Sequence, residues 1–406
     1  MTHIEQMIQD MCPNGIEFKY LTDVANVLYG YPFEAEKFSE DERNIPLIRI
    51  RDVVPAKAST YYTGTYPKEF IIKAGDILVG MDGNFNLEKW KDRNGLLNQR
   101  VCKIYSKNSD AVLDNFLYHL LKPLFKKIED EIKGGTVKHL SAARIKQIEI
   151  PLPPIEIQKK IVECLDKFSA LAAELQAELQ MRRKQYEYYR TRLLTPHSES
   201  DSTDNTDDAT SSSWQWKTLG EICELVKERV SAAELNENNY VGVENLLSNK
   251  QGKIPSVSVP ATGNVIKFSK DNILIGNIRP YLRKIWFADC DGGTNGDVIT
   301  LEIKDKYQNM ILPKFLYHAL ADERFFIYDT QYSSGAKMPR GDKDKVMEYK
   351  IPLPSLAEQE RIVSILDKFE ALTTSLSEGI PAEQAAQQKR YEYYRDLLLT
   401  FDRKAE

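Results

Sequence analysis

The chain contains an internal repeat, and this feature constrains its architecture more than any other. The stretch IPLPPIEIQKKIV at residues 150–162 returns as IPLPSLAEQERIV at 351–363, with seven of thirteen positions identical. Three shorter matches keep the same order, and they are FLYHLL at 116–121 with FLYHAL at 315–320, LDKF at 165–168 with 366–369, and YEYYR at 186–190 with 391–395. This series predicts a globular segment followed by a long helix, built twice.

The repeat divides the 406 residues into five predicted segments. They are a first globular domain at 1–150, a central helix at 151–197, an acidic flexible linker at 198–213, a second globular domain at 214–350 and a distal helix at 351–406. The linker, SESDSTDNTDDATSSS, carries five acidic side chains and no basic one, which equals the whole net charge of −5. Because the rest of the chain is neutral, the acidic total does not exclude a nucleic-acid partner.

Both globular segments have the pattern of mixed α and β structure. Short apolar runs bounded by Gly, Asp and Asn are typical of strands, and they include 46–50, 71–79, 273–278 and 298–303. The FLYH matches lie in longer stretches whose apolar residues recur every three or four positions, as in helices. The predicted fold class is therefore α+β, and His119 and His318 are expected to have a structural role within packed helices.

Each copy of the repeat ends in a long helix. After the prolines of PLPP, which suit a helix start, apolar positions follow the four-and-three spacing of a coiled coil. These seam positions are Ile161, Leu165, Phe168, Leu175, Leu179, Tyr186 and Tyr189 on the central helix, and Ile362, Leu366, Phe369, Leu376, Tyr391 and Tyr394 on the distal helix. We expect the two helices to pair as an antiparallel coiled coil. The alternative is that each helix packs on its own globular domain.

The distal helix has four more residues between its matches than the central helix. Four residues are about one helical turn, so the direction of the seam is kept. Gly379 and Pro381 lie in this insertion, and a proline inside a helix costs about 3 kcal/mol. The sequence therefore predicts a kink or a short break there.

Other features of the sequence favour a cytoplasmic protein. The five cysteines are scattered without a C-x-x-C pair, which predicts free thiols rather than a zinc or redox site. No run of about 18 apolar residues occurs, and the N-terminus lacks the pattern of a signal peptide. We therefore expect no membrane partner.

The motif PLPP-x-x-x-Q-x-x-I followed by LDKF occurs at 151–168, and a close copy that begins PLPS occurs at 352–369. Two such motifs after two dissimilar domains resemble the specificity subunit of type I restriction-modification enzymes. The resemblance implies two target-recognition domains, 1–150 and 214–350, each of which reads one half of a split sequence in double-stranded DNA. It also implies that the helices set the unread spacer and dock two methyltransferase subunits and, through them, restriction/translocase subunits.

In that family the partner subunits perform methylation and ATP-driven cleavage. The resemblance therefore implies a non-catalytic chain with no cofactor or metal of its own. S-adenosylmethionine, ATP and magnesium are expected in the partner subunits.

Candidate DNA-reading side chains lie in Gly- and Asn-rich loops of both domains. Bases are read by side chains with paired donors and acceptors, typically Arg or Lys on guanine and Asn or Gln on adenine. The candidates are Asn84, Asn86, Asn98, Gln99, Arg100 and Lys138 in the first domain, and Asn277, Arg279, Tyr281, Arg283, Lys284, Asn295, Lys337 and Arg340 in the second. Lys138, Lys337 and Arg340 are alternatively phosphate contacts, which position a protein without specifying sequence.

Two other classes of protein are open at this point. Asp289 or Asp291 followed by Glu302-Ile303-Lys304 has the D…E-x-K form of a metal-dependent nuclease. However, this form is common by chance, and the first domain offers no equivalent. A two-headed coiled-coil scaffold or regulator outside restriction-modification would show the same repeat. Neither a G-x-x-x-x-G-K-[ST] phosphate loop nor a [DN]-P-P-[YF] methyltransferase loop occurs.

Overall fold

The computed structural model describes residues 3–132, 138–196, 214–374 and 379–404. The chain divides into two compact units, one of Met1–Ala173 with Ala386–Glu406 and the other of Glu174–Ala385. This division cuts through two helices, α6 (Ile155–Leu193) and α12 (Gly379–Leu399), so each unit contains part of both. The predicted linker at 198–213 lies outside the described residues. The segment boundaries drawn from the repeat therefore stay a prediction.

The first unit contains two sheets. One is antiparallel in the order β2-β10-β7-β8, with strands β2 (Ala25–Tyr29), β10 (Val101–Ser106), β7 (Ile77–Gly80) and β8 (Leu87–Lys89). The other has the order β3-β5-β4-β9-β6, with strands β3 (Phe38–Ser39), β5 (Tyr61–Tyr62), β4 (Ile45–Ile48), β9 (Gly95–Leu97) and β6 (Ile71–Ile72). The run predicted as one strand at 71–79 is two strands, β6 and β7. A turn separates them, in which Gly75 has φ +95° and the N–H of Asp76 bonds the carbonyl of Lys73.

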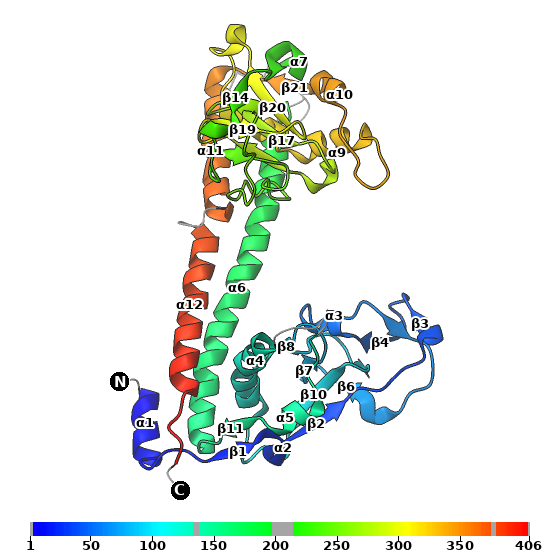
Figure 1. Ribbon diagram of the computed structural model, residues 1–406, viewed down its shortest axis with the longest axis vertical. Helices are drawn as coiled ribbons and strands as arrows, with labels where there is room; N and C mark the ends of the chain where they lie inside the picture. Colours follow the sequence, from blue (N-terminus) through cyan, green and yellow to red (C-terminus); the bar gives the residue numbers. More distant parts are fainter. Residues whose placement is uncertain (1–2, 133–137, 197–213, 375–378, 405–406) are drawn as a thin grey trace, which may run out of the picture. The chain divides into compact units, whose positions relative to one another are not determined.

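Helices cover the first sheet and complete the core of this unit. The long helix α4 (Asp114–Glu131) contacts β8 and β10 (Figure 1). The shorter helical segments are α1 (His3–Met11), α2 (Leu21–Val24), η1 (Ala35–Lys37), α3 (Ile50–Val53), η2 (Lys68–Phe70) and α5 (Ala142–Lys146). Strands β1 (Phe18–Tyr20) and β11 (Glu149–Pro151) pair beside them. Ile161 and Leu165, on the first turns of α6, are fully buried in the same core as Phe116 of α4.

The second unit repeats this plan. Its main sheet has the order β13-β20-β17-β18, with strands β13 (Cys223–Leu225), β20 (Val298–Ile303), β17 (Ile273–Gly276) and β18 (Ile285–Phe287). A smaller sheet has the order β14-β16-β19-β15, with strands β14 (Arg229–Ser231), β16 (Asn264–Phe268), β19 (Gly292–Thr294) and β15 (Tyr240–Val241). Strands β12 (Gln215–Thr218) and β21 (Lys350–Leu353) pair as β1 and β11 do. The repeat found in the sequence therefore extends to the sheets of the two globular segments.

Helical segments also connect and cover the strands of the second unit. They are α7 (Leu219–Ile222), η3 (Ala232–Glu234), η4 (Pro280–Leu282), η5 (Asp305–Tyr307), α8 (Pro313–Leu320), α9 (Glu323–Gln331), α10 (Lys343–Glu348) and α11 (Leu356–Thr374). Helices α8 and α9 together take the place that α4 has in the first unit. Ile362 and Leu366 of α11 are buried in the main core with Phe315 of α8. Both units thus combine sheets and helices, as the predicted α+β class requires.

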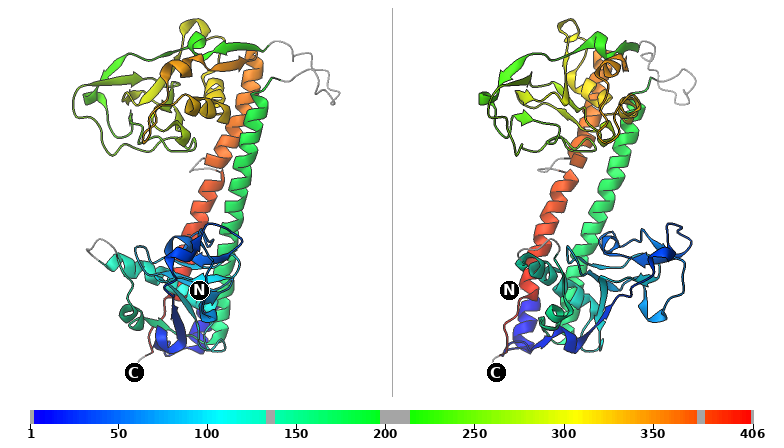
Figure 2. Two further views of the ribbon diagram at one scale, coloured as in Figure 1. Left: turned by 90° about the vertical axis from the view of Figure 1, so that its right-hand side faces the viewer. Right: turned by 45° about the vertical axis from the view of Figure 1, so that its right-hand side comes forward.

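The long helices pair in antiparallel fashion. Within the second unit, Gln176 bonds Gln384 at 3.0 Å, while Tyr186, further along α6, stacks on Phe369, which precedes Gln384. Within the first unit, the rings of Phe168 and Tyr394 stack at 5.3 Å between α6 and α12. Within each unit, α6 runs alongside the part of the distal helix that the unit contains (Figures 1 and 2). The predicted pairing is confirmed. The alternative also holds in part, because Ile161, Leu165, Ile362 and Leu366 pack on their own globular cores.

The predicted break in the distal helix is present. Helix α11 ends at Thr374, and α12 begins at Gly379 with φ +80°. A Cβ on Gly379 would lie 2.7 Å from the carbonyl oxygens of Ala371 and Leu372, so glycine is required there. Pro381 lies in the first turn of α12, where a missing N–H costs little. Leu376, a predicted seam residue, lies outside the described residues. None of the described helices has the length and hydrophobicity of a membrane-spanning segment.

Candidate functional site

Three loops of the first unit converge beyond the end of β7. They are 81–86 after β7, 98–100 before β10, and 138–140 before α5, and backbone hydrogen bonds tie them together. The N–H of Met81 donates to the carbonyl of Arg100 at 2.8 Å, and the N–H of Gly83 donates to that of Lys138 at 2.8 Å. The N–H of Leu140 returns a bond of 2.7 Å to the carbonyl of Met81. We call these segments the first loop set.

Side chains reinforce the first loop set. The carboxylate of Asp82 bonds Arg100 and also Nδ1 of His139, the latter at 2.5 Å. Burial opposes the ionisation of Asp82, but the hydrogen bonds from His139 and Arg100 outweigh it and hold the pKa of this carboxyl below its usual value. Asp82 is thus an ionised centre between two basic side chains, which are themselves about half exposed.

The second unit builds the same three loops from 277–283, 295–297 and 338–341. Here the N–H of Asn277 donates to the carbonyl of Asp297 at 2.9 Å, and the N–H of Arg279 donates to that of Pro339 at 2.7 Å. The N–H of Gly341 donates to the carbonyl of Asn277 at 3.0 Å. These three bonds match the three bonds of the first loop set one for one. We call these segments the second loop set.

The scaffold of the two loop sets is the same, but their side chains are not. Arg100 and Asp297 hold equivalent positions, because their carbonyls accept the equivalent bond. In the first set the acid, Asp82, lies on the first loop, whereas in the second set Asp297 lies on the second loop and pairs with Arg340 at 3.0 Å. The two loop sets thus share one backbone frame and carry different side chains on it.

The predicted reading residues differ in how far their side chains are exposed to solvent. The exposed ones are Asn84, Gln99, Arg100, Tyr281, Lys337 and Arg340, and the half-buried ones are Asn86, Lys138, Arg279, Arg283, Lys284 and Asn295. Asn98 and Asn277 are each only 6% exposed. The structure brings most of them into the two loop sets, while Lys284 directly follows the segment 277–283 and Lys337 directly precedes the segment 338–341. Their contacts with DNA stay predictions.

Several of these side chains are already held by the protein. The ammonium groups of Lys138 and Lys284 donate to the carbonyls of Glu129 and Val243, each at 2.6 Å. Burial lowers the pKa of Lys284. The Asn98 side chain accepts from the N–H of Gln99 at 2.9 Å, so it closes its own turn. Arg279 differs, since its guanidinium makes no ion pair with any described residue and its backbone has φ +55°.

His119 and His318 are fully buried on α4 and α8, as expected. Nε2 of His119 bonds Asp166 at 2.7 Å, and Nε2 of His318 bonds Asp367 at 2.8 Å. The FLYH and LDKF motifs of each copy are therefore joined by one hydrogen bond, which anchors the long helix to its globular domain. Burial lowers the pKa of both imidazoles, although the neighbouring carboxylates act in the opposite direction.

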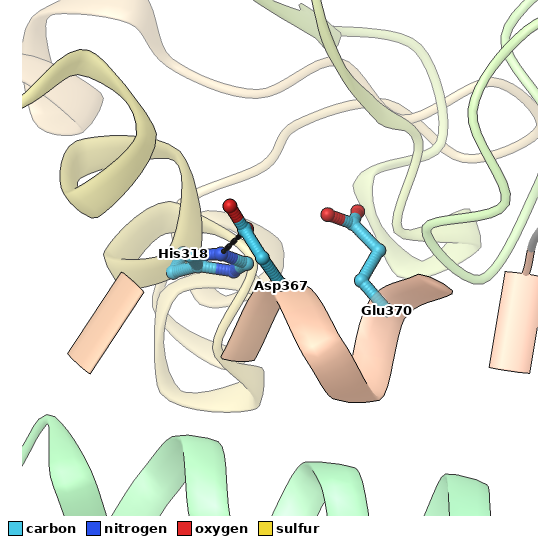
Figure 3. Close-up of side chains that lie close together, drawn as sticks. All are labelled: His318, Asp367 and Glu370. Carbon is cyan, nitrogen blue, oxygen red and sulfur yellow. Dashed lines mark hydrogen bonds and ion pairs between the residues drawn. The ribbon is translucent and has the colours of Figure 1, made fainter. Parts of the chain in front are cut away.

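Glu370 lies beside the second pair, and His318, Asp367 and Glu370 have the spacing of a metal site, with ligand atoms within 4.8 Å (Figure 3). However, the ammonium of Lys314 lies 2.9 Å from Glu370 and 3.8 Å from Asp367, so it already supplies positive charge. In the first unit the position of Glu370 is occupied by Ser169, and the histidine pair forms all the same. These observations favour a structural pair.

The nuclease alternative finds no geometric support in the described part of the chain. Asp291 accepts a hydrogen bond from the N–H of Lys270 at 2.7 Å, and Glu302 lies on β20 opposite Glu224 of β13. Among the described residues, the groups able to hold a metal ion do not include Asp289, Asp291 or Glu302. The D…E-x-K spacing therefore has no matching cluster.

Sequence reasoning missed the acids and glutamines that join the repeat motifs. Asp166, Asp367, Gln158 and Gln359 all bond across long sequence separations. Their signal was present, because polar residues kept identical between two diverged copies mark positions with specific partners. Asp329, a buried acid of α9, gave no such signal.

Comparison with known proteins agrees with this architecture. The family model described as type I restriction modification DNA specificity domain matches residues 13–181 and 211–384. The EcoR124I/EcoR124II specificity subunit of Escherichia coli is 32% identical over 343 residues, which cover 77% of each chain. The EcoBI specificity subunit of the same species is 39% identical over 160 residues, covering 39% of this chain and 34% of that one.

Solved structures share the fold. The S subunit of a type I restriction-modification system from M. genitalium matches with a TM-score of 0.54 at 19% identity, over 95% of this chain and 96% of that one. A chain from a structure titled for complex assembly and conformational transition of the type I R-M system matches with a TM-score of 0.52 at 17% identity, over 95% and 98%. With the family model matching both repeats, the chain belongs to the family of type I restriction-modification specificity subunits, and its role is recognition of a DNA target.

Proposed function

We propose that the two loop sets read the two halves of a bipartite DNA sequence, one half each. The observation that carries this proposal is the pair of matched backbone frames bearing different side chains, Asp82 with Arg100 in one and Asp297 with Arg340 in the other. A common frame presents each set to the groove in the same way, and the changed side chains select different bases.

Exchange of one domain tests this proposal. Residues 1–150 are replaced by the corresponding domain of another family member, and the methylated sites in the host DNA are sequenced. The expected result is that one half of the recognised sequence changes while the other half and the spacer length stay the same. A change in both halves would contradict the assignment of one half to each loop set. The reciprocal exchange of 214–350 is the matched control.

The paired helices are proposed to set the spacer and to dock two methyltransferase subunits. Stacked aromatic pairs, Phe168 with Tyr394 and Tyr186 with Phe369, make the pairing specific in register. The methyltransferases would carry S-adenosylmethionine, and restriction subunits would add ATP- and magnesium-dependent cleavage. This chain would then be the non-catalytic subunit of a complex acting on cytoplasmic DNA.

Co-purification tests the docking proposal. A tagged chain, expressed with a methyltransferase encoded beside it, should retain two copies of that subunit for each copy of the chain, as measured by native mass spectrometry. Substitution of the exposed Tyr188 and Tyr393 by Ser should weaken retention if the outer helix faces are the docking surface. Unchanged retention would place docking elsewhere on the chain.

A further inference from the structure

A buried acid lies behind the second loop set. Asp329, on α9, is 1% exposed, and neither of its carboxylate oxygens has a hydrogen-bond partner among the described residues. Buried polar groups in folded proteins are almost always bonded, and an unpaired buried carboxylate is especially unfavourable. Asp329 therefore needs either a hydrogen-bond donor or a proton of its own to be stable in this position.

Asn277, the first residue of the second loop set, lies beside Asp329. Its side-chain oxygen Oδ1 is also buried and without a donor. A Cβ placed on Gly341 would lie 2.4 Å from Oδ1 of Asp329 and 2.8 Å from Oδ1 of Asn277, so both oxygens meet at this glycine. Glycine is required at 341 because any side chain would displace one of them. Two acceptor oxygens thus lie at this glycine, and neither has a hydrogen-bond donor among the described residues.

In the first unit, the buried acid behind the loop set has hydrogen-bond donors. Glu129, near the end of α4, is 5% exposed and also lies behind its loop set. Its Oε2 accepts from the backbone N–H of Phe85 at 3.1 Å, and its Oε1 pairs with Lys126 at 3.0 Å. Both oxygens of the Glu129 carboxylate therefore have a donor. Asp329 has no comparable donor, so its own proton is the group that can complete the contact with Asn277.

Most charged side chains of the second loop set and of helices α8, α9 and α10 have other partners, and no described residue bonds the carboxylate of Asp329. The ion pairs are Glu323 with Arg283, Arg324 with Asp322, His318 with Asp367, Arg340 with Asp297 and Lys345 with Glu348. Lys343 donates a hydrogen bond to the carbonyl of Gly296. Arg279 has no ion pair among the described residues. None of these groups changes the pKa of Asp329, and burial alone raises this pKa to about 6. With this pKa of about 6, Asp329 loses its proton at a higher pH than an exposed aspartate does.

We propose that Asp329 is a positioning residue of the second loop set, which in its neutral form donates a hydrogen bond to Oδ1 of Asn277 and turns the amide nitrogen toward DNA. When Asp329 loses its proton, the amide rotates so that Nδ2 donates to the carboxylate and Oδ1 faces outward. The same asparagine then presents an acceptor in place of a donor, and these select different base edges. The proposal rests on the assignment of DNA reading to the second loop set.

The test measures half-site discrimination against pH. The full chain, assembled with its methyltransferase, is titrated with cognate DNA and with DNA altered in either half, between pH 5 and pH 8. For the wild type, discrimination at the half-site read by the second unit should change several-fold across pH 6, while discrimination at the other half stays constant. Asp329→Asn keeps the shape and donates permanently to Oδ1, so its discrimination should stay at the low-pH value throughout.

Glu348→Gln, which changes an exposed acid on α10 of the same unit, is the control, and it should leave the pH profile of the wild type unchanged. A wild-type profile that is flat at both half-sites, or one shared by Asp329→Asn, would overturn the role of Asp329 alone. Failure of the chain to discriminate at that half-site at any pH would overturn the reading function as well. The wild-type profile needs no variant, so the test does not depend on the folding of Asp329→Asn.

Discussion

The side chain of Gln158 accepts a hydrogen bond from the backbone N–H of Leu113 at 3.0 Å, and its Nε2 donates to the carbonyls of Ala111 and Pro153 at 2.9 and 2.8 Å. Gln359 makes the same three bonds in the second unit, with Leu312, Met310 and Pro354. Both glutamines are fully buried. The single glutamine of the repeated motif therefore fastens the first turn of each long helix to the segment before the FLYH helix.

Gln158→Leu should strongly destabilise the first unit. The substitution leaves one N–H and two carbonyl groups without partners, and each unsatisfied buried group costs about 1 to 3 kcal/mol. We expect the free energy of unfolding, measured by urea denaturation, to fall by roughly 3 kcal/mol. Gln180→Leu, on an exposed position of α6, is the control and should change stability by less than about 0.5 kcal/mol. Equal effects of the two variants would contradict the role of Gln158.

The sequence predicted the parts of this fold that periodicity and repetition encode. The length of α6, the break at Gly379 and the pairing of the helices follow from local spacing. The partners of Gln158 and Asp166 do not, because Leu113 and His119 lie 45 and 47 residues away in the chain. Asn98 looks like a free reading residue in sequence, yet it is buried and closes its own turn, since the first loop set forms only when three distant segments meet. Asp329 is matched in the other unit by Glu129 through its place on the helix and not through any repeated motif.

His119→Gln should reduce the dependence of stability on pH. Burial lowers the pKa of His119 below its usual value, against the effect of Asp166. A base with a lowered folded-state pKa contributes stability that is present above about pH 6.5 and is lost as the pH falls toward the folded-state value. Wild-type stability should therefore drop between pH 7.5 and pH 5.5, and the drop should be smaller in His119→Gln, which keeps a neutral donor to Asp166.

Urea denaturation followed at both pH values checks this expectation. Gln180→Leu, on an exposed position of α6, is the control and should keep the pH dependence of the wild type. If His119→Gln and the wild type lose the same stability over this range, the neutral buried imidazole is not the source of the pH dependence.

Arg279→Ala should relax recognition at the half-site read by the second unit. Its guanidinium has no ion pair among the described residues, whereas Arg100 pairs with Asp82 and Arg340 with Asp297. A free arginine on a reading loop is suited to a guanine edge, and its loss costs about 1 to 3 kcal/mol of binding free energy at that position. Binding to cognate and altered DNA, compared by fluorescence anisotropy, should show reduced discrimination there.

Arg229→Ala is the control for Arg279→Ala, since Arg229 is an exposed arginine on β14 of the same unit. It should leave discrimination unchanged. A variant of Arg279 that alters only the dependence of affinity on salt would instead identify a phosphate contact.

Deletion of residues 381–384 should shorten the unread spacer without changing either half-site. These four residues lie in the first turns of α12, just after the required Gly379, and four residues correspond to about 6 Å of helix. That rise equals roughly two base pairs along DNA at about 3.4 Å each, so sequencing of methylated sites should report a spacer shorter by one or two base pairs. The double variant Glu383→Ala with Gln384→Ala keeps the length and removes the bond between Gln384 and Gln176. It should retain the original spacer, and a spacer that survives the deletion would mean that the length of α12 does not set the distance between the half-sites.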